Sequence, residues 1–197
     1  MSNIEKFIDN EEIHIPELLR IGLVHYQFET VHPFLDGNGR VGRLIIPLYL
    51  VSKRILKKPV LYLSDFFEKN RKLYYDNLTV VREKNDLGQW FKFFLVGVIE
   101  TAKNGINTFD GIMQLQKQTD IKIQSLGSRA TKAKKVIDYL YKHPMITADK
   151  VSEVASISMP SSYKLITDLE DMNVLREMTG GQRSRMYLFD KYIKLFR

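Results

Sequence analysis

The side chains with the clearest chemistry lie together in residues 32–43, which read HPFLDGNGRVGR. Glycines at positions 37 and 39 let backbone N–H groups approach a ligand closely, and a helix beginning behind them would direct its positive end to the same place. Arg40 and Arg43 are three residues apart on the first turn, so both guanidinium groups can reach the outer phosphates of a nucleotide. The segment is therefore predicted to bind phosphate.

Two further side chains of this segment indicate what happens to the bound phosphate. Asp36, at the entry of the loop, can hold a hard cation such as Mg²⁺, which prefers a carboxylate plus phosphate oxygens to an all-protein cage. His32 ends the preceding helix and faces the same loop, and imidazole is suited to take a proton from a hydroxyl near neutral pH. The combination predicts nucleotide chemistry in which a hydroxyl group is activated.

Neither a dinucleotide-binding motif nor a plain turn accounts for the glycines as well. Residues 37–42 formally match G-x-G-x-x-G, but the dinucleotide-binding motif must follow a strand, and this one follows an amphipathic helix. A plain Asn-Gly turn would explain the glycines, but not the histidine, carboxylate, asparagine and two arginines that converge there. Phosphate binding is the interpretation that explains them all.

The other histidines are not assigned to this site. His25, Glu29 and His32 share a helix face, which could suggest a metal site, but no further His or Cys cluster lies nearby in the sequence. His25 is interpreted as a partly buried core residue. His14 and His143 are interpreted as loop residues without a role.

Hydrophobic periodicity predicts the helices that position the segment. One helix begins at Pro16 and runs to about Val31, where Pro33 and the Asn-Gly turn prevent its continuation. The next, from Arg40 to Val51, is apolar enough to be mostly buried and should be kinked at Pro47. Further helices are predicted from an N-cap at Ser64 to Leu78, from Leu87 to Ile99, and, as a polar connector, from Ala102 to Ile123.

Composition sets the class of protein. Hydrophobic residues make up 44% of the 197 residues and charged residues 27%, which are ordinary globular values. The absence of cysteine excludes disulfides, Cys-based zinc sites and a thiol nucleophile. The N-terminus lacks a signal-peptide pattern, and the longest apolar run, Leu44–Val51, is too short to cross a membrane. A soluble, cytoplasmic protein without membrane contact is expected.

A second, smaller unit is predicted to begin at Gly127, giving domains at 1–126 and 127–197. The second has 13 Lys/Arg and 8 Asp/Glu, a net charge of +5, against +2 for the first. Three short helices are followed by two strands on either side of a glycine turn, an order similar to a winged helix-turn-helix. The helices are expected at Thr131–Tyr141, Ile146–Ala155 and Ile157–Leu169, and the strands at 174–178 and 185–189.

A basic winged helix suggests DNA as a partner, although such units also serve in protein docking or in formation of a homodimer. Its recognition helix would begin near Met159. The residues that could touch phosphates or bases are Ser161, Ser162, Tyr163 and Lys164 on that helix and Gln182, Arg183 and Arg185 on the wing.

At residues 32–43 the sequence resembles the Fic (filamentation induced by cAMP) family, whose signature His-Pro-Phe-x-Asp/Glu-Gly-Asn-Gly-Arg-x-x-Arg it matches throughout. The resemblance continues through His-Tyr-Gln-Phe-Glu-Thr at 25–30 and the stretch at 61–75, and many bacterial members carry a C-terminal winged helix. It implies a mainly α fold, with a Fic-type helical bundle followed by a winged helix-turn-helix of α+β type.

The resemblance also implies an activity, the transfer of AMP from Mg-ATP to a Ser, Thr or Tyr hydroxyl of a target protein with release of pyrophosphate. His32 would deprotonate the acceptor hydroxyl, and Asp36 would hold Mg²⁺. Phe34 would anchor the loop in the core. The other implied roles are an anion hole at Gly37, Asn38 and Gly39, distal phosphate binding by Arg40 and Arg43, and an adenine-side position for Tyr74 and Tyr75.

Two family features have no match in this sequence. A hairpin flap that docks the target usually precedes the helix containing His25, whereas a short acidic stretch precedes Pro16 here. An inhibitory helix of pattern Ser/Thr-x-x-x-Glu-Gly/Asn is not found either, since Glu68 and Glu83 are each followed by lysine. Met1 is therefore a candidate internal methionine of a longer chain, and the core is expected to lack its inhibitor.

Other functions remain open on sequence grounds. The Fic-like core could act as a nucleotide sensor in a transcription regulator or toxin-antitoxin component whose winged helix does the work. Within enzymes, the loop recognises phosphates better than a base, so another nucleotidyl donor or removal of AMP from a modified target is also compatible.

Overall fold

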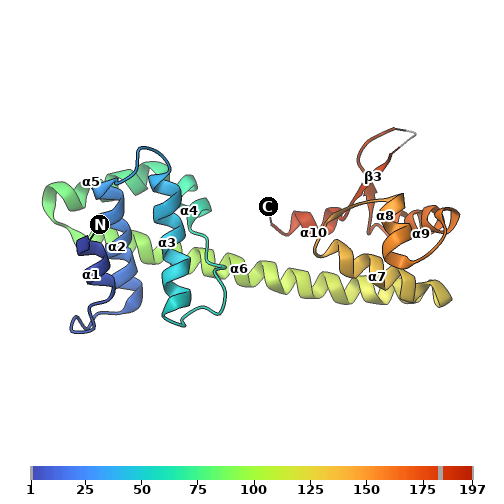
Figure 1. Ribbon diagram of the computed structural model, residues 1–197, viewed down its shortest axis with the longest axis horizontal. Coiled ribbons are helices and arrows are strands. Elements are labelled where there is room, and N and C mark those ends of the chain that lie inside the picture. The colour runs from blue at the N-terminus through green and yellow to red at the C-terminus, as the bar shows by residue number, and fades with distance from the viewer. Residues whose placement is uncertain (1, 182–183, 197) are drawn as a thin grey trace. The chain divides into compact units, whose positions relative to one another are not determined.

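The computed structural model describes residues 2–181 and 184–196 and is mainly α-helical. The chain divides into two compact units, Met1–Ile106 and Asn107–Arg197 (Figure 1). The polar connector and the helix before it form one uninterrupted helix, α6 (Leu87–Gln124), so the predicted break near residue 100 is wrong. Its glycines are isolated from one another, and a single glycine in a helix is tolerated. Each unit is described separately.

The first unit is a bundle of helices around an aromatic core. Trp90 and Phe94 of α6 are fully buried together with Phe28, and the Trp90 indole N–H donates to the Gly22 carbonyl at 3.0 Å. The bundle consists of α1 (Ser2–Ile8), α2 (Glu17–Val31), α3 (Asn38–Ser52), α4 (Ser64–Lys69), α5 (Arg71–Lys84) and the first part of α6.

Helices α2 and α3 lie side by side and carry the loop between them (Figure 1). Helix α2 ends at Val31, as its pattern predicts. Helix α3 continues through Pro47, but the prediction that it is mostly buried is wrong. Val41, Leu44 and Leu48 are between 36% and 51% exposed, because the core is reached by the opposite face through Ile46, Tyr49 and Leu50.

The helix predicted from Ser64 is two helices. The backbone leaves helical geometry at Asn70, with φ −110° and ψ 31°, and the Asn70 side-chain amide donates to the Phe66 carbonyl at 2.9 Å. The backbone N–H of Asn70 donates to the same carbonyl at 3.0 Å, so the end of α4 is closed by two hydrogen bonds from one residue. Leu63, rather than Ser64, occupies the N-cap position, and it makes no side-chain capping bond. Helix α1 is an element that the sequence patterns do not predict.

The second unit combines short helices with a small sheet. The predicted hairpin is confirmed as an antiparallel pair, β2 and β3, but a third strand, β1, pairs on the other side of β3. Ile146 and Thr147 belong to β1 and not to a helix as predicted; Thr147 is extended and its hydroxyl caps the helix that follows. The elements are η1 (Gly127–Arg129), α7 (Ala130–Leu140), β1 (Met145–Thr147), α8 (Ala148–Ala155), α9 (Met159–Asp171), β2 (Arg176–Glu177), β3 (Met186–Leu188) and α10 (Asp190–Lys194).

The core of the second unit lies between its helices and the sheet. Leu140, Leu165 and Phe189 are fully buried in it, and Leu115 and Ile123 of α6 pack there as well. Three helices followed by a hairpin are consistent with the expected winged helix-turn-helix. In the part of the chain that the structure describes, no helix is long and apolar enough to cross a membrane.

Candidate functional site

The loop between α2 and α3 begins with a reversal of the backbone at His32. This residue has left-handed geometry, with φ 49° and ψ 56°, and its backbone N–H donates to the Phe28 carbonyl at 3.0 Å. The conformation is uncommon for a residue other than glycine, although histidine is among the side chains enriched in it. It ends α2, and His32 is exposed at the start of the loop.

Asn38 holds the loop in shape from inside. Its side chain is 2% exposed and grips the backbone of Phe34 in both directions: Oδ1 accepts from the Phe34 N–H at 2.8 Å, and Nδ2 donates to the Phe34 carbonyl at 2.5 Å. The amide of Asn38 is therefore used within the loop, and its backbone N–H is the group that remains for a ligand.

Phe34 contributes less to the core than expected. Its side chain is 48% exposed, and the ring lies against Phe28 with centroids 6.2 Å apart. The expectation that Phe34 anchors the loop by burial is wrong; its backbone, through two hydrogen bonds to the Asn38 side chain, holds this part of the loop instead.

The first turn of α3 offers free backbone donors. Gly37 precedes the helix with φ +83°, which L side chains rarely adopt, and the first intrahelical bond runs from the Val41 N–H to the Gly37 carbonyl at 3.0 Å. The N–H groups of residues 38–40 come before that bond and have no partner within the helix. With the positive end of the helix dipole, they favour an anion at this point.

Both arginines fold back toward the glycines. A Cβ placed on Gly39 would lie 3.1 Å from Nη1 of Arg43, and one on Gly37 would lie 3.4 Å from Nη2 of Arg40. The two guanidinium groups therefore flank the backbone donors. An anion bound to those donors would be within reach of two positive charges that can form bidentate bonds.

Asp36 is tied to the same cluster. Its Oδ1 accepts from the Gly37 N–H at 2.6 Å, and its Oδ2 lies 3.2 Å from Nη2 of Arg40. The two side chains of this ion pair are 92% and 76% exposed, so the pair is worth little and can be exchanged for other partners. Mg²⁺ is commonly held by one or two carboxylates together with phosphate oxygens, and Asp36 could supply such a carboxylate if phosphate were bound here.

The predicted loop residues from His32 to Arg43 border one cavity of about 330 Å³. Tyr74 and Tyr75 of α5 line the same cavity, so the structure brings together the two parts of the predicted site. The residues that sequence reasoning missed are Leu35, which protrudes fully from the loop, and Phe67, Glu68 and Arg71 at the junction of α4 and α5. The sequence pattern excludes Glu68 as an inhibitory glutamate and gives it no other role, and the resemblance at 61–75 assigns no role to Phe67 or Arg71.

The two tyrosines differ in what they can offer. Tyr75 is 54% exposed, whereas Tyr74 is 4% exposed and its hydroxyl lies 3.0 Å from Nε2 of His25. Burial raises the pKa of Tyr74 far above its ordinary value, so the hydroxyl stays protonated. Tyr75 is thus the side chain of this pair that can contact a ligand freely.

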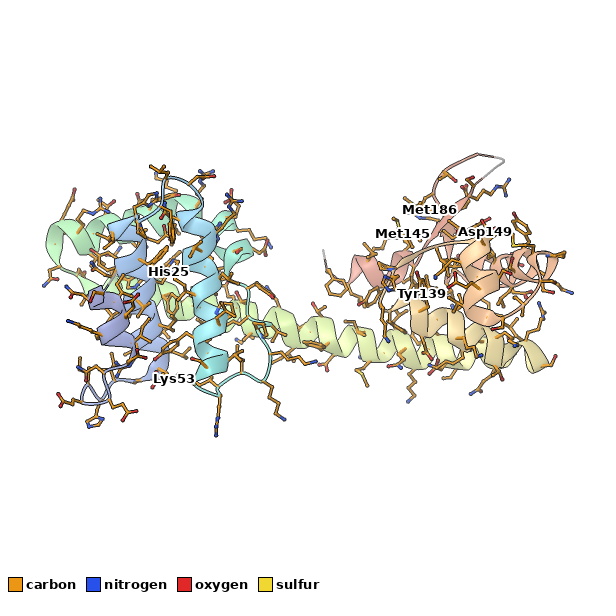
Figure 2. The ribbon with its side chains drawn as sticks, viewed as in Figure 1. His25, Lys53, Tyr139, Met145, Asp149 and Met186 are labelled. Carbon is orange, nitrogen blue, oxygen red and sulfur yellow. The ribbon has the colours of Figure 1, made fainter. Side chains whose placement is uncertain are left out.

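Two buried groups lie behind the loop. His25 of the first unit (Figure 2) is a core residue as predicted, but it is fully rather than partly buried, and burial lowers its pKa to about 4. Glu29 has a buried Oε1 without a hydrogen-bond partner, and burial raises its pKa although positive charge at Arg43 and His32 opposes the shift. Nowhere in residues 2–181 and 184–196 do three or more His, Asp or Glu side chains form a group that could hold a metal.

The DNA-contact candidates of the second unit are only partly placed as predicted. Ser161, Tyr163 and Lys164 of α9 are exposed, but Ser162 is fully buried and its hydroxyl donates to the Met159 carbonyl at 2.8 Å. The prediction of a contact role for Ser162 is wrong, since it faces the core side of α9. Arg185 is exposed and its Nε donates to the Gly181 carbonyl at 2.8 Å, whereas Gln182 and Arg183 lie outside the described residues.

Comparison with known proteins bears on the same segment. Residues 1–50 match the family model described as the Fic/DOC family. These residues include α2, the loop and most of α3. The match supports the Fic family.

Curated relatives that are similar to part of this chain are named as protein adenylyltransferases. A probable protein adenylyltransferase of Aquifex aeolicus is 30% identical over 105 residues, which are 52% of this chain and 32% of that protein. Protein adenylyltransferase Fic of Culex quinquefasciatus is 32% identical over 94 residues, 47% of this chain and 17% of that protein. The chain thus spans about a third or less of the length of these relatives.

A solved structure resembles the fold more widely. The crystal structure of a Fic family protein from Desulfovibrio desulfuricans G20 matches 95% of this chain and 53% of its own, with a TM-score of 0.51 and 19% identity. At this level of identity the likeness supports the mainly α fold and not a shared activity.

Proposed function

We propose that this chain is a protein adenylyltransferase, which transfers AMP from Mg-ATP to a hydroxyl side chain of a target protein and releases pyrophosphate. The observation that carries the proposal is the convergence, on one cavity, of an exposed histidine, a carboxylate, free helix N–H groups and two arginines. The names of the relatives from Aquifex aeolicus and Culex quinquefasciatus support the same activity.

In this reaction His32 accepts the proton of the target hydroxyl, and the oxygen attacks the α-phosphorus of ATP. The bond from the α-phosphorus to the bridging oxygen breaks, and pyrophosphate leaves. The anion hole expected at Gly37, Asn38 and Gly39 is proposed at the N–H groups of residues 38–40, because the Gly37 N–H donates to Asp36. These groups stabilise charge on the phosphate oxygens, and Arg40 and Arg43 hold the distal phosphates. Phosphoryl-type transfer depends mostly on positioning and charge stabilisation, which these groups supply.

The proposal includes Mg²⁺, which Asp36 would bind. Its exposed carboxylate is free to leave Arg40, which in turn becomes available to phosphate. Mg²⁺ bound there with the phosphates would neutralise part of their charge and fix their orientation. The proposal includes a cytoplasmic location.

The experiment is incubation of the full chain with Mg²⁺ and ATP labelled at the α-phosphate, followed by detection of label on the protein itself or on added protein extract. His32→Ala should lower labelling by at least about 10²-fold, because a positioned general base contributes that much or more. The matched control is His14→Ala, since His14 is an exposed loop histidine that does not border the cavity.

Three results would change the proposal. Label from γ-phosphate in place of α-phosphate would make the chain a phosphoryl-transfer enzyme. Loss of AMP from a previously modified target would make it a de-AMPylating enzyme. ATP binding by calorimetry without any transfer would favour the nucleotide-sensor alternative.

For the second unit we propose DNA binding by a winged helix-turn-helix. The supporting observation is that Ser161, Tyr163 and Lys164 of α9 are exposed, and that Arg185 is exposed beside β3. Binding of mixed-sequence duplex DNA by the full chain should weaken as salt rises, because phosphate contacts release counterions. Concentration-dependent dimerisation without DNA binding would instead favour the homodimer role, and His32→Ala should affect neither.

A further inference from the structure

Three helices meet at one buried imidazole. His25 of α2 places Nδ1 3.0 Å from the Gly42 carbonyl of α3 and Nε2 3.0 Å from the hydroxyl of Tyr74 of α5. The ring is fully buried and stacks between neighbours, with centroids 5.4 Å from Phe67 and 6.0 Å from Trp90. Its position is therefore fixed by ring contacts and at both nitrogens.

The partners determine where the protons are. A carbonyl can only accept, so Nδ1 of His25 must carry the hydrogen that is donated to Gly42. Nε2 then has a free lone pair and accepts the hydroxyl hydrogen of Tyr74. Burial, with the positive charge of Arg43, lowers the pKa of His25 to about 4, which keeps the ring neutral and preserves this direction of hydrogen bonding.

The two ends of this relay, the chain of hydrogen bonds from Tyr74 through His25 to Gly42, belong to two helices that line the cavity. Gly42 lies in the second turn of α3, between Gly39 and Arg43, which bind the phosphates in the proposed function. Tyr74 belongs to α5 and lines the cavity itself, as does its neighbour Tyr75. A single side chain of α2 thus joins α3 to α5 by hydrogen bonds.

We propose that the relay from Tyr74 through His25 to Gly42 sets the position of the phosphate-binding turn relative to the α5 wall, so that His25 and Tyr74 are positioning residues for nucleotide binding. This inference rests on the proposed function for the identity of the ligand. The Tyr74 hydroxyl bonds to His25, which in turn bonds to the backbone of α3. A phenylalanine at position 74 keeps the ring but cannot form this link.

The test uses Tyr74→Phe, which removes one hydroxyl and keeps the ring. The matched control is Tyr49→Phe: Tyr49 is another buried tyrosine of the first unit, 5% exposed, whose hydroxyl bonds to Glu17 and which does not border the cavity. Calorimetry of Mg-ATP binding to the full chain should give about threefold to tenfold weaker binding for Tyr74→Phe, the usual range for a lost buried hydrogen bond. Tyr49→Phe should leave ATP affinity unchanged.

Two further measurements do not depend on ATP. Amide hydrogen exchange should become faster at residues 38–43 in Tyr74→Phe but not in Tyr49→Phe. The nitrogen-15 spectrum of the parent should show His25 neutral with its proton on Nδ1. These readouts report on the relay even if the chain transfers no AMP. Absence of AMP transfer would count against the proposed function but not against the relay.

Two outcomes would overturn the inference. One is equal exchange at residues 38–43 in both tyrosine variants, which would mean that the hydroxyl of Tyr74 positions nothing. The other is a neutral His25 protonated on Nε2, because Nδ1 could then not donate to Gly42.

Discussion

The loop between α2 and α3 of the first unit and the α9 surface of the second unit are held in different ways. In the loop, Asn38 grips Phe34 by two bonds and Asp36 bonds to the next residue, so the polar groups are fixed by contacts four residues apart or less. On α9, Tyr163 and Lys164 extend from a helix that is fixed through its buried side. In the proposed functions, the loop would therefore be preorganised for its ligand, whereas the exposed side chains of α9 would pay an ordering cost on binding.

The largest effect is expected when the two hydrogen bonds from the Asn38 side chain to Phe34 are removed. Asn38→Ala leaves the N–H and carbonyl of Phe34 without partners and should lower the rate of AMP transfer by about 10²-fold, the cost of a misplacement near 1 Å. The measurement is the initial rate of labelling from α-labelled ATP. Asn77→Ala is the control, since Asn77 is 5% exposed and bonds to its own helix. Equal rates in the two variants would contradict the idea that the loop is held by its own contacts.

The buried histidine should make the first unit sensitive to acid. The pKa of His25 is about 4 in the folded chain against 6.5 for an unperturbed histidine, so the unfolded chain binds a proton that the folded chain does not. The free energy of unfolding should therefore fall by about 3 kcal/mol as pH is lowered from 6.5 to 4. Glu29, with its raised pKa, acts in the opposite direction over its own range.

Denaturant unfolding at several pH values measures this dependence, with His25→Gln as the variant that lacks the titrating ring. The dependence should be smaller in that variant. If His25→Gln does not fold, nitrogen-15 titration of His25 in the parent decides the matter: a titration midpoint near 6.5 would show that the ring is not buried as described.

Smaller effects on ATP affinity and stability are expected from alanine at glycines with different amounts of space around the added methyl group. Alanine at position 39 would place a methyl group 3.1 Å from Nη1 of Arg43, so Gly39→Ala should weaken ATP binding severalfold by displacing the guanidinium. Gly105 has nothing within 4 Å of the same position, and Gly105→Ala should instead stabilise the chain by about 0.5–1 kcal/mol through better helix propensity. Calorimetry with ATP and thermal unfolding measure the two. A stabilised Gly105→Ala with unchanged affinity is the internal control for Gly39→Ala.

The smallest change is expected on α9. Lys164→Ala should reduce the slope of log affinity for DNA against log salt by about one, if Lys164 contacts a phosphate. Lys103→Ala, on the exposed side of α6 in the first unit, provides the comparison and should leave the slope unchanged. A slope identical in parent and Lys164→Ala would remove this residue from the DNA surface.

Sequence patterns are informative where structure is local. The loop between α2 and α3 follows from the residue types at 32–43, because the glycine conformation, the helix start and the arginine spacing all depend on neighbours in the chain. The hairpin of β2 and β3 is predictable for the same reason, since Gly180 with φ +63° lies in its turn.

Most of the sequence-based predictions that the structure contradicts depend on contacts between residues far apart in the chain. The strand β1 is only three residues long and exists because Ile146 pairs with Tyr187, far along the chain. A serine on a recognition helix is usually exposed, yet the position of Ser162 faces the core. His25 is predictable as a core residue, but its bonds to Gly42 and Tyr74 join residues 17 and 49 positions away, which no spacing rule relates.

Helix α6 limits how this chain can be divided or recombined. The two units meet at residues 106 and 107, in the middle of a helix that runs from Leu87 to Gln124. Trp90 and Phe94 serve one core, and Leu115 and Ile123 serve the other. A gene fusion or deletion placed at that border would cut hydrogen-bonded turns rather than a loop, so exchange of either unit as a module requires that the whole of α6 be transferred with it.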